Sequence, residues 1–369
     1  MSNRTFTDEQ LREVIALFQV YGDILAVNRY GSGHINDTFK VDMSLGGVPV
    51  SYILQRINDG IFTRPDRVME NIARVTNHIR CKFAGASDAT RRTLTVIQSR
   101  DGQPVARGPE GGWWRMYVFI AGAKTIDLIE NADQARKAAK AFAGFQNALA
   151  DLPAPRLFET IPNFHNTLSR IEQLNVAAAE DKVGRKASVA AELAFVAART
   201  EEAGKIVKMM AAGEIPERIT HNDTKINNVM LDDATGEGIA VIDLDTVMPG
   251  CALYDFGDMV RTSTAAAAED EKDLSKVFSR KEYFEALVKG YLSEAKFLTD
   301  SEKENLAFSG RLITLTIGIR FLTDYLAGDT YFHTAYPEHN LVRCRTQFKM
   351  VESMEAQKEE YEAIVRAGA

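Results

Sequence analysis

The chain has 369 residues, a length that corresponds to two or three average domains. Its 44 Lys and Arg residues face 51 Asp and Glu residues, so the formal net charge is −7. This acidity argues against a protein that binds nucleic acid or a membrane surface through a basic face, although one phosphate site needs only local positive charge. Apolar residues at 45% and charged residues at 26% are ordinary globular usage and argue against general disorder.

The cysteines and the apolar segments indicate in which cellular compartment the protein is expected to work. Cys81, Cys251 and Cys344 are too few and too scattered for a disulfide framework or a zinc site. The N-terminal stretch MSNRTFTDEQ lacks the apolar segment of a signal peptide, and no apolar run reaches about 18 residues. We therefore expect a soluble cytoplasmic protein with no membrane partner, and the sequence leaves its oligomeric state open.

The first 120 residues alternate short apolar strands with glycine turns, which predicts an antiparallel sheet accompanied by two helices. The first helix is expected to begin after Thr7, because Gln10 three residues later completes a capping-box pattern. Pro65 is expected to open the second helix. The stretch 93–108 reads as a hairpin with Asp101-Gly102 at its turn.

After Ala121-Gly122 the character of the sequence changes, and helical periods dominate. One helix is expected over 188–210, and Ser301 with Glu304 is expected to cap a long helix that follows. We therefore predict an α+β protein with two lobes. Residues 1–121 would form a β-rich lobe, and residues 122–369 a larger, mainly helical lobe.

One strand-like island, RITHNDTKINNVMLDD followed by GIAVIDLDTVMPG, interrupts the helical part. Its polar residues lie in the loop before one strand and at the end of the next, where reactive groups are commonly held. Asp223, Asn228, Asp243 and Asp245 form a set of hard oxygen donors that suits Mg²⁺. For any one of them alone, a solvated turn or a cap is the competing interpretation.

The order His221-Asn222-Asp223, then Asn228, then Asp243 matches the catalytic arrangement of kinases. In detail, H-N-D-x-x-x-x-N with I-D-L-D resembles the aminoglycoside phosphotransferase and choline kinase superfamily. The longer run HNDTKINNVMLD, together with VIDLDTVMPG and YDFGD, is closer still to the N-acetylhexosamine 1-kinases, as are GSGHINDTF and IRFLTDYLAGDTYF. The resemblance covers roughly residues 20 to 350 and implies the two-lobed protein-kinase-like fold. Residues 1–121 would then be the nucleotide-binding lobe, and residues 122–369 the catalytic and substrate-binding lobe. The resemblance also implies phosphorylation of the anomeric hydroxyl of N-acetylglucosamine or N-acetylgalactosamine by ATP.

The resemblance assigns roles to the island. Asp223 would be the base or orienting group for the accepting hydroxyl. Asn228 and Asp243 would hold Mg²⁺ on the phosphates of ATP, with Asp245 as an assisting metal group or, equally, a capped strand end. His221 and the YDFGD segment are expected to be structural.

The nucleotide site is less clearly marked. Gly31 and Gly33 belong to a turn whose backbone N–H groups suit phosphates, although Gly-Ser-Gly is also an ordinary hairpin turn. The third strand, YILQRIN, lacks the lysine that protein kinases place there. Arg56, with Glu70 on the next helix as its partner, is our candidate for that role, and a surface arginine is the alternative.

Two groups of residues are predicted to bind the sugar, one after the glycine turn and one on the long C-terminal helix and just past its end. Polar side chains would bind the sugar hydroxyls and an aromatic ring would cover an apolar face. Turn caps in the first group and an intrahelical Arg–Asp pair in the second are the alternatives. The residues are His34, Asn36, Asp37, Arg320, Asp324 and Tyr331.

Three other functions remain open at this stage. The first is a kinase of the same fold for another acceptor, such as an aminoglycoside, choline or homoserine. The second is a regulatory pseudokinase, which the intact Asp223, Asn228 and Asp243 argue against. The third is a metal-dependent hydrolase, which would not need the β-rich lobe.

Overall fold

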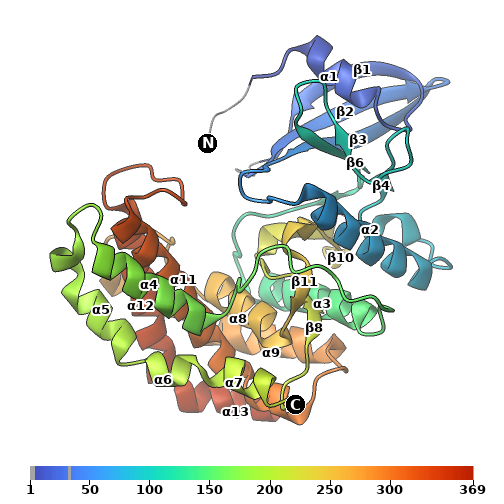
Figure 1. Ribbon diagram of the computed structural model, residues 1–369. Helices are drawn as coiled ribbons and strands as arrows, with labels where there is room; N and C mark the ends of the chain where they lie inside the picture. Colours follow the sequence, from blue (N-terminus) through green and yellow to red (C-terminus); the bar gives the residue numbers. More distant parts are fainter. Residues whose placement is uncertain (1–4, 32–34, 369) are drawn as a thin grey trace. The chain divides into compact units, whose positions relative to one another are not determined.

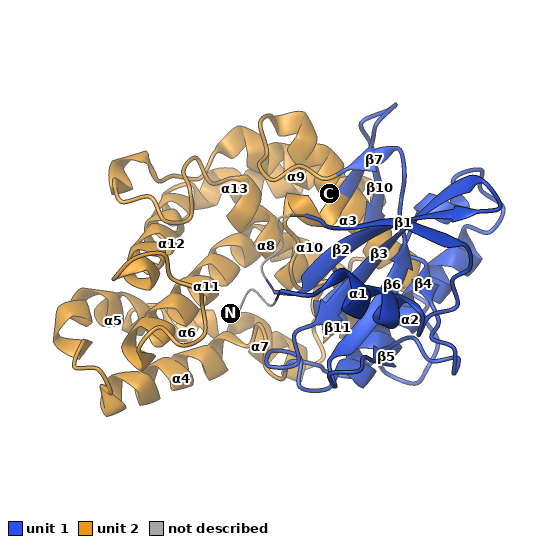
Figure 2. Ribbon diagram, turned by 90° about the horizontal axis from the view of Figure 1, so that it is seen from above, with its two compact units in different colours: residues 1–124, 151–161, 230–248 blue, residues 125–150, 162–229, 249–369 orange. Residues whose placement is uncertain are grey.

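The computed structural model describes residues 5–31 and 35–368. By its internal contacts the chain forms two compact units, coloured separately in Figure 2. Unit 1 comprises residues 1–124, 151–161 and 230–248; unit 2 comprises residues 125–150, 162–229 and 249–369. Unit 1 is strand-rich and unit 2 is mainly helical (Figure 1), as expected for the predicted α+β class. The units are discontinuous in sequence, and the predicted lobe boundary between residues 121 and 122 stays a prediction.

Unit 1 is built on a six-stranded sheet in which β1, β2, β3, β6 and β4 follow one another, and β5 also pairs with β6. The pairings of β1 with β2, β2 with β3, and β6 with β3, β4 and β5 are antiparallel. The strands are β1 (Asp23–Arg29), β2 (Asp37–Leu45), β3 (Val48–Ile57), β4 (Val96–Ile97), β5 (Ala106–Arg107) and β6 (Trp113–Val118).

The two faces of this sheet are covered by different helices. Helix α1 (Asp8–Ile15) packs on an apolar cluster to which β2 contributes alternate residues and β6 contributes Trp114 and Met116. Arg115 and Tyr117 point to the opposite face, where both contact Met69 of α2 (Pro65–Lys82). The side chain of Arg115 is thus enclosed between the sheet and α2.

The later segments of unit 1 add a three-stranded sheet in the order β10, β9, β7. These strands are β7 (Ala123–Lys124), β9 (Val229–Asp232) and β10 (Gly238–Val241). A turn of 3-10 helix, η4 (Leu244–Thr246), follows β10. The Asp-rich IDLDT segment therefore begins where a buried strand ends, as the sequence predicts.

Unit 2 is a bundle of helices with one short strand pair, β8 with β11. Helix α11 is central to it and contacts α4, α8 and α12, while α3 packs on α9. Its elements are α3 (Ala132–Leu149), α4 (Thr167–Glu180), α5 (Ala190–Ala197), α6 (Thr200–Ala203), α7 (Lys205–Ala211), β8 (Arg218–Thr220), β11 (Met248–Gly250), α8 (Ala252–Ser263), α9 (Lys281–Glu294), α10 (Asp300–Glu304), α11 (Leu306–Ala327), α12 (His339–Ala356) and α13 (Lys358–Gly368).

Helix α11 is long and apolar enough to cross a membrane, but 78% of its most apolar window is buried inside the protein. It therefore behaves as a core helix that is apolar on nearly all sides. Helix α8 approaches it closely through two glycines. A Cβ on Gly257 would lie 2.4 Å from the carbonyl oxygen of Ser309, and one on Gly310 would lie 2.6 Å from Val260.

Predictions that rest on local sequence signals are confirmed more often than predictions of strand pairing. The capping box of Thr7 and Gln10 and the helix start at Pro65 are both present. The turn predicted at Asp101-Gly102 is present, with the Gly102 N–H donating to the Ser99 carbonyl oxygen at 2.9 Å. The strand pairing predicted over 93–108 is wrong, because β4 and β5 each pair with β6 and not with each other.

The helix starts in the second half needed two further corrections. The capping box lies at Thr299 and Glu302 rather than at Ser301 and Glu304, and it caps α10, after which α11 begins separately. The expected helix over 188–210 is divided into α5, α6 and α7.

Candidate functional site

The kinase-like motif lies in a loop of unit 2, residues 221–228, that follows β8 and ends in a turn of 3-10 helix, Ile226–Asn228. The chain turns sharply at Asn222, whose φ of 66° is left-handed, a conformation that Asn adopts more readily than most residues. A Cβ on Gly250 of β11 would lie 2.3 Å from Thr220 Oγ1, so a glycine permits the close strand approach before the loop.

Asp255 on α8 holds the start of this loop. Its carboxylate is fully buried and accepts the backbone N–H groups of His221 at 2.8 Å and Asn222 at 2.7 Å. Gln146 on α3 donates a third hydrogen bond at 2.6 Å. Burial raises the pKa of Asp255 to about 6, against the lowering effects of His221 and these hydrogen bonds.

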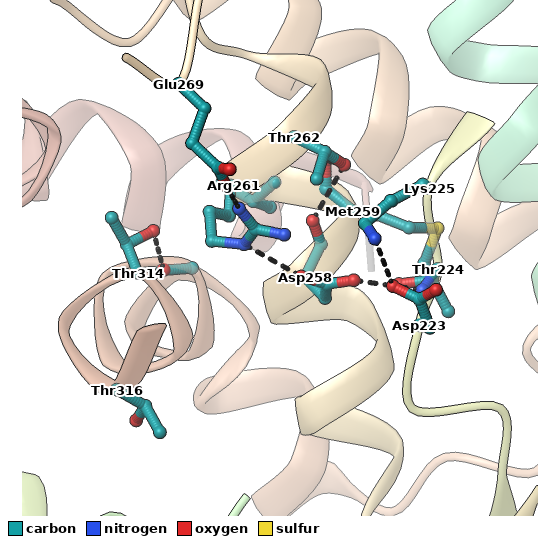
Figure 3. A network of polar contacts seen from close by, with 12 residues as sticks. Asp223, Thr224, Lys225, Asp258, Met259, Arg261, Thr262, Glu269, Thr314 and Thr316 are labelled. Carbon is teal, nitrogen blue, oxygen red and sulfur yellow. Dashed lines mark hydrogen bonds and ion pairs between the residues drawn. The ribbon is translucent and has the colours of Figure 1, made fainter. Parts of the chain in front are cut away.

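Asp258, one helical turn later, holds the next part of the loop (Figure 3). It accepts the Thr224 N–H at 2.9 Å and forms an ion pair with Arg261 at 2.8 Å. Arg261 also pairs with Glu269 at 2.9 Å. Both carboxylates of the YDFGD segment therefore support the loop backbone, which confirms the structural role predicted for the segment.

Asp223 lies within this frame with its side chain 29% exposed. Lys225 forms an ion pair with it at 2.9 Å, and the Asn228 amide donates to its Oδ2 at 3.2 Å and to its carbonyl oxygen at 2.8 Å (Figure 3 shows the ion pair). Burial alone would raise the pKa of Asp223, but Lys225, then His221 and Arg261, outweigh it and leave the pKa below its ordinary value. Asp223 is therefore a carboxylate at neutral pH.

Arg320 on α11 is half-buried among aromatic rings. Its guanidinium carbon lies 5.0 Å from the ring centre of Phe164, 5.7 Å from Tyr331 and 5.4 Å from Phe332. Burial lowers its pKa, whereas Tyr331 and the charge of Asp223 raise it, so Asp223 acts on it electrostatically. Arg170 is a second cation nearby, since burial and the charge of Arg320 lower the pKa of Arg170 to about 10.

Asp324 holds the segment that follows α11. One carboxylate oxygen accepts the N–H groups of Thr330 at 2.9 Å and Tyr331 at 2.8 Å. The other accepts the N–H of Phe332 and the amide of Asn340, both at 2.9 Å. Asp324 thus holds the backbone at Thr330, Tyr331 and Phe332, and its predicted direct contact with a sugar stays a prediction.

In unit 1, the two carboxylates after β10 differ in their surroundings. Asp243 is exposed and left-handed, with φ 57°. Asp245 is 4% exposed; Arg115 donates to one of its oxygens and the Asn36 amide donates to the other at 2.7 Å. Burial would lower the pKa of Arg115, but Asp245, with Tyr117 and Asp243, raises it above its usual value. Asp245 therefore anchors the segment after β10 within unit 1, and its predicted metal ligation stays a prediction.

Among the residues predicted to bind the nucleotide, the structure describes Gly31, Arg56 and Glu70. Gly31 is exposed with φ 78°, a conformation that favours glycine. Arg56 pairs with Asp59 at 4.0 Å, while Glu70 is exposed on α2. The predicted Arg56–Glu70 ion pair is therefore not formed among the described residues, and their part in nucleotide binding stays a prediction.

The residues predicted for the sugar near the glycine turn are Asn36 and Asp37 together with His34. Asn36 is used in unit 1 itself, since it bonds to Asp245 and accepts the Asn58 N–H at 3.0 Å. Asp37 pairs with Arg29 of β1 at 3.3 Å. Gly33 and His34 lie outside the described residues, so their predicted roles remain as stated.

Residues 26–291 match the phosphotransferase enzyme family, which is most of the chain. The chain belongs to this family. The match includes the 221–228 loop, Asp243 and the YDFGD segment, so the predicted catalytic motif of this phosphotransferase lies within the region shared with the family.

Solved structures share its fold at low sequence identity. A choline kinase from Cryptosporidium parvum matches with a TM-score of 0.60 at 13% identity, covering 98% of this chain and 99% of that one. A spectinomycin phosphotransferase in complex with ADP and spectinomycin gives 0.58 at 14%, covering 96% and 100%. An ethanolamine kinase from Plasmodium vivax gives 0.53 at 14%, covering 87% and 82%. The predicted two-lobed aminoglycoside phosphotransferase fold is thereby confirmed.

The fit of this phosphotransferase to Mg²⁺ rests on its oxygen donors. Among residues 5–31 and 35–368, no three His, Cys, Asp or Glu side chains cluster as a metal site. Mg²⁺ does not need such a cluster, because it is commonly held by one or two protein oxygens together with phosphates and waters. The Asn228 amide nitrogen is committed to Asp223, which leaves its oxygen as the ligand-type atom, and Asp243 is an exposed carboxylate. The chemistry of these donors fits Mg²⁺.

The structure brings some predicted residues together and adds others. Asp223 contacts Asn228, and Arg320 contacts Tyr331 at 3.5 Å. Sequence reasoning missed Lys225, although its place two residues after Asp223 was a usable signal. It also missed Arg115, whose signal was one cation inside the apolar strand WWRMYVFI.

Proposed function

We propose that this phosphotransferase transfers the γ-phosphoryl group of ATP to the anomeric hydroxyl of an N-acetylhexosamine, N-acetylglucosamine or N-acetylgalactosamine. The observation that best supports a kinase is the ionised, partly exposed Asp223 in a loop whose backbone is fixed by α8. The choice of sugar rests on the motifs that resemble the N-acetylhexosamine 1-kinases, including Arg320 and Tyr331.

In the proposed reaction, the anomeric oxygen forms a bond to the γ-phosphorus, the bond from that phosphorus to the β-phosphate oxygen breaks, and ADP leaves. The hydroxyl proton is accepted by Asp223, directly or on its way to solvent. A carboxylate with a lowered pKa is a weak base, so orienting the hydroxyl is its larger contribution. An anomeric hydroxyl is more acidic than an ordinary alcohol, which suits such a base.

The proposal assigns metal ligation to Asn228 in unit 2 and to Asp243 in unit 1, on the strength of the sequence pattern and their donor chemistry. Bound Mg²⁺ offsets the negative charge of the ATP phosphates. Lys225 adds a positive charge beside Asp223 and, through its 2.9 Å ion pair, keeps that carboxylate ionised. The choice between ATP and GTP as the phosphoryl donor stays open. One relative of this fold was solved in complex with GDP.

The acceptor choice is supported by the charges around Arg320. Within the described part of the chain, no carboxylate forms an ion pair with Arg320 or Arg170; Arg170 donates to the carbonyl oxygen of Phe164 and to Gln173. Two arginines without acidic partners disfavour a cationic acceptor and favour neutral oxygen-rich groups. Tyr331, 52% exposed, offers a ring to an apolar sugar face.

The competing proposal is a kinase of this fold for a cationic acceptor. The similar structures include proteins named for spectinomycin, choline and ethanolamine. Amines of this kind are usually bound by carboxylates and aromatic cages, whereas the Arg320 surroundings are basic. We therefore rank this alternative second.

The test is a panel assay of ADP release with Mg-ATP. The acceptors are N-acetylglucosamine, N-acetylgalactosamine, glucose, spectinomycin, choline, ethanolamine and homoserine, and Asp223→Asn is the control for contaminating kinases. We expect ADP release with the two N-acetylhexosamines and none in the control. Turnover confined to the amines would reject the sugar, and no turnover with any hydroxyl acceptor would favour the pseudokinase.

A further inference from the structure

Arg115 is the largest fully buried side chain among the described residues, at 1% exposure, and it lies in the interior of a sheet. Its neighbours in β6, Trp114, Met116 and Tyr117, are buried too, so the strand is otherwise apolar or aromatic. A buried arginine is costly unless it is paired and hydrogen-bonded, so its partners indicate what it is for.

The partners of Arg115 come from three different elements. Gln55, its direct register neighbour on β3, accepts its Nε–H at 2.9 Å, and Met69 of α2 lies 3.8 Å from Nη1. Nη1 also pairs with Asp245, which is two residues after Asp243. The third strand therefore presents Gln55, not lysine, and the buried cation is supplied by the adjacent strand β6.

Asp245 in turn joins separate parts of unit 1. Its second oxygen accepts a hydrogen bond from the Asn36 side-chain amide at 2.7 Å, and the side-chain oxygen Oδ1 of Asn36 accepts the Asn58 N–H at 3.0 Å. Asn58 donates back to Ile35 at 3.2 Å. One carboxylate thus links β6, the segment after the glycine turn, and the chain just beyond β3.

The same loop is fastened again two residues later. Asn71, 1% exposed on α2, donates to the Val247 carbonyl oxygen at 3.0 Å and to the Phe158 carbonyl oxygen at 2.8 Å. Asp243 itself is exposed and left-handed, a conformation that persists in a residue other than glycine where neighbouring contacts determine it. Anchors at 245 and 247 are such contacts.

We propose that the Arg115–Asp245 ion pair is the positioning device for the metal-binding Asp243, and that Asn36 extends its control to the segment after the glycine turn. The pair takes the organising role that the strand lysine and its helix glutamate have in protein kinases. In this proposal Asp245 acts through the backbone of η4, since it is 4% exposed and each of its oxygens accepts a hydrogen bond within unit 1. The inference rests on the proposed metal role of Asp243 and is independent of which acceptor is phosphorylated.

The test removes both charges together, with Arg115→Met and Asp245→Asn in one protein, because Arg115→Met alone leaves a buried carboxylate unpaired. The matched control is Arg199→Met with Glu355→Gln, which removes an ion pair of 2.7 Å that is also partly buried, in unit 2. Calorimetry measures ADP binding to each full-length protein with and without Mg²⁺, and steady-state kinetics give separate KM values for Mg-ATP and for the acceptor.

For the Arg115/Asp245 variant we expect metal-free ADP binding within twofold of the unaltered protein. Mg²⁺ is expected to increase the affinity of the unaltered protein for ADP. In the variant this increase is at least about tenfold smaller, as is typical when groups that orient a metal ligand are removed. The KM for Mg-ATP rises by more than the KM for the acceptor. In the control variant, Mg²⁺ increases the affinity for ADP as much as it does in the unaltered protein. We call this increase in affinity the Mg²⁺ gain.

Three results would overturn the proposal. One is a Mg²⁺ gain in the variant equal to that of the unaltered protein. Another is an equal loss of ADP binding with and without Mg²⁺, which would mean that the pair only supports the fold. The third is no Mg²⁺ gain in the unaltered protein, which would remove the metal role of Asp243. If the calorimetry gives the expected results but the sugar assay fails, only the proposed acceptor is rejected.

A second variant is used if the double variant does not fold. Asn36→Ala leaves the ion pair in place and must lower the Mg²⁺ gain by at least about twofold. An unchanged gain would reject the proposal.

Discussion

Replacing Arg320 with methionine separates a substrate-binding role from a structural one. In the structure Arg320 has three rings around its guanidinium and the Tyr331 hydroxyl at 3.5 Å, and burial lowers its pKa. A half-buried cation without an acidic partner among the described residues gains from a hydrogen-bond acceptor supplied by the substrate. A charge-assisted hydrogen bond of this kind contributes about 1.5–3 kcal/mol. Its loss corresponds to a rise in the acceptor KM of roughly 10- to 150-fold.

The same change should leave stability intact, because methionine fills similar apolar space and the cost of burying the charge disappears. Steady-state kinetics with each substrate varied in turn and thermal unfolding check both expectations. The control is Arg311→Met on the same helix, where the arginine packs on Phe308 and pairs with Glu202. An Arg320→Met protein with equal KM changes for ATP and acceptor, or a lowered melting temperature with an unchanged KM, would refute the reasoning.

Three further changes test the 221–228 loop and the helices that hold it. Asp223→Asn should lower kcat at least about 100-fold while ADP binding by calorimetry is unchanged; a smaller loss would remove Asp223 from its role. Asp255 has a pKa raised to about 6, so its stabilising effect is present at low pH and is lost as the pH rises through about 6. The difference in melting temperature between the unaltered protein and Asp255→Asn should therefore narrow between pH 5 and pH 7.5, and a constant difference would contradict this. Gly257→Ala places a Cβ 2.4 Å from the Ser309 carbonyl and should cost about 1–3 kcal/mol in denaturant unfolding; no loss would show that α8 and α11 can separate.

The fold elements that the sequence predicted are those with local signals. Thr7 with Gln10 and Pro65 mark helix starts through contacts within one turn, so they can be recognised without the rest of the chain. Strand pairing depends on a choice among several partners. β5 joins β6 through the nearby pair Arg107 and Trp113, and β4 joins β6 through the more distant pair Val96 and Tyr117, so that β4 and β5 do not pair with each other. The second capping box was misplaced because the run TDSEKEN contains the same spacing twice, at Thr299 and at Ser301.

The site was predicted to a similar extent and for similar reasons. Asp223 and Asn228 are five residues apart in one loop, so their contact follows from the motif. The sequence did not predict that Arg115 is the buried cation of the sheet, because this depends on the register between β3 and β6. Adjacent residues of β3 face opposite sides, and Gln55 is the neighbour of Arg115 whereas Arg56 is the neighbour of Trp114. Nothing near residue 115 in the sequence shows that its partner is Asp245.

The central claim, a sugar 1-kinase, is tested most directly by the position of the phosphate on the product. Phosphorus and proton NMR of the product from Mg-ATP and N-acetylglucosamine or N-acetylgalactosamine distinguish an anomeric phosphate from a phosphate at any other hydroxyl. The account predicts a phosphorus signal coupled to the anomeric proton, with one ADP released per sugar consumed. A 6-phosphate, or a phosphorylated product only with a non-sugar alcohol, would contradict it.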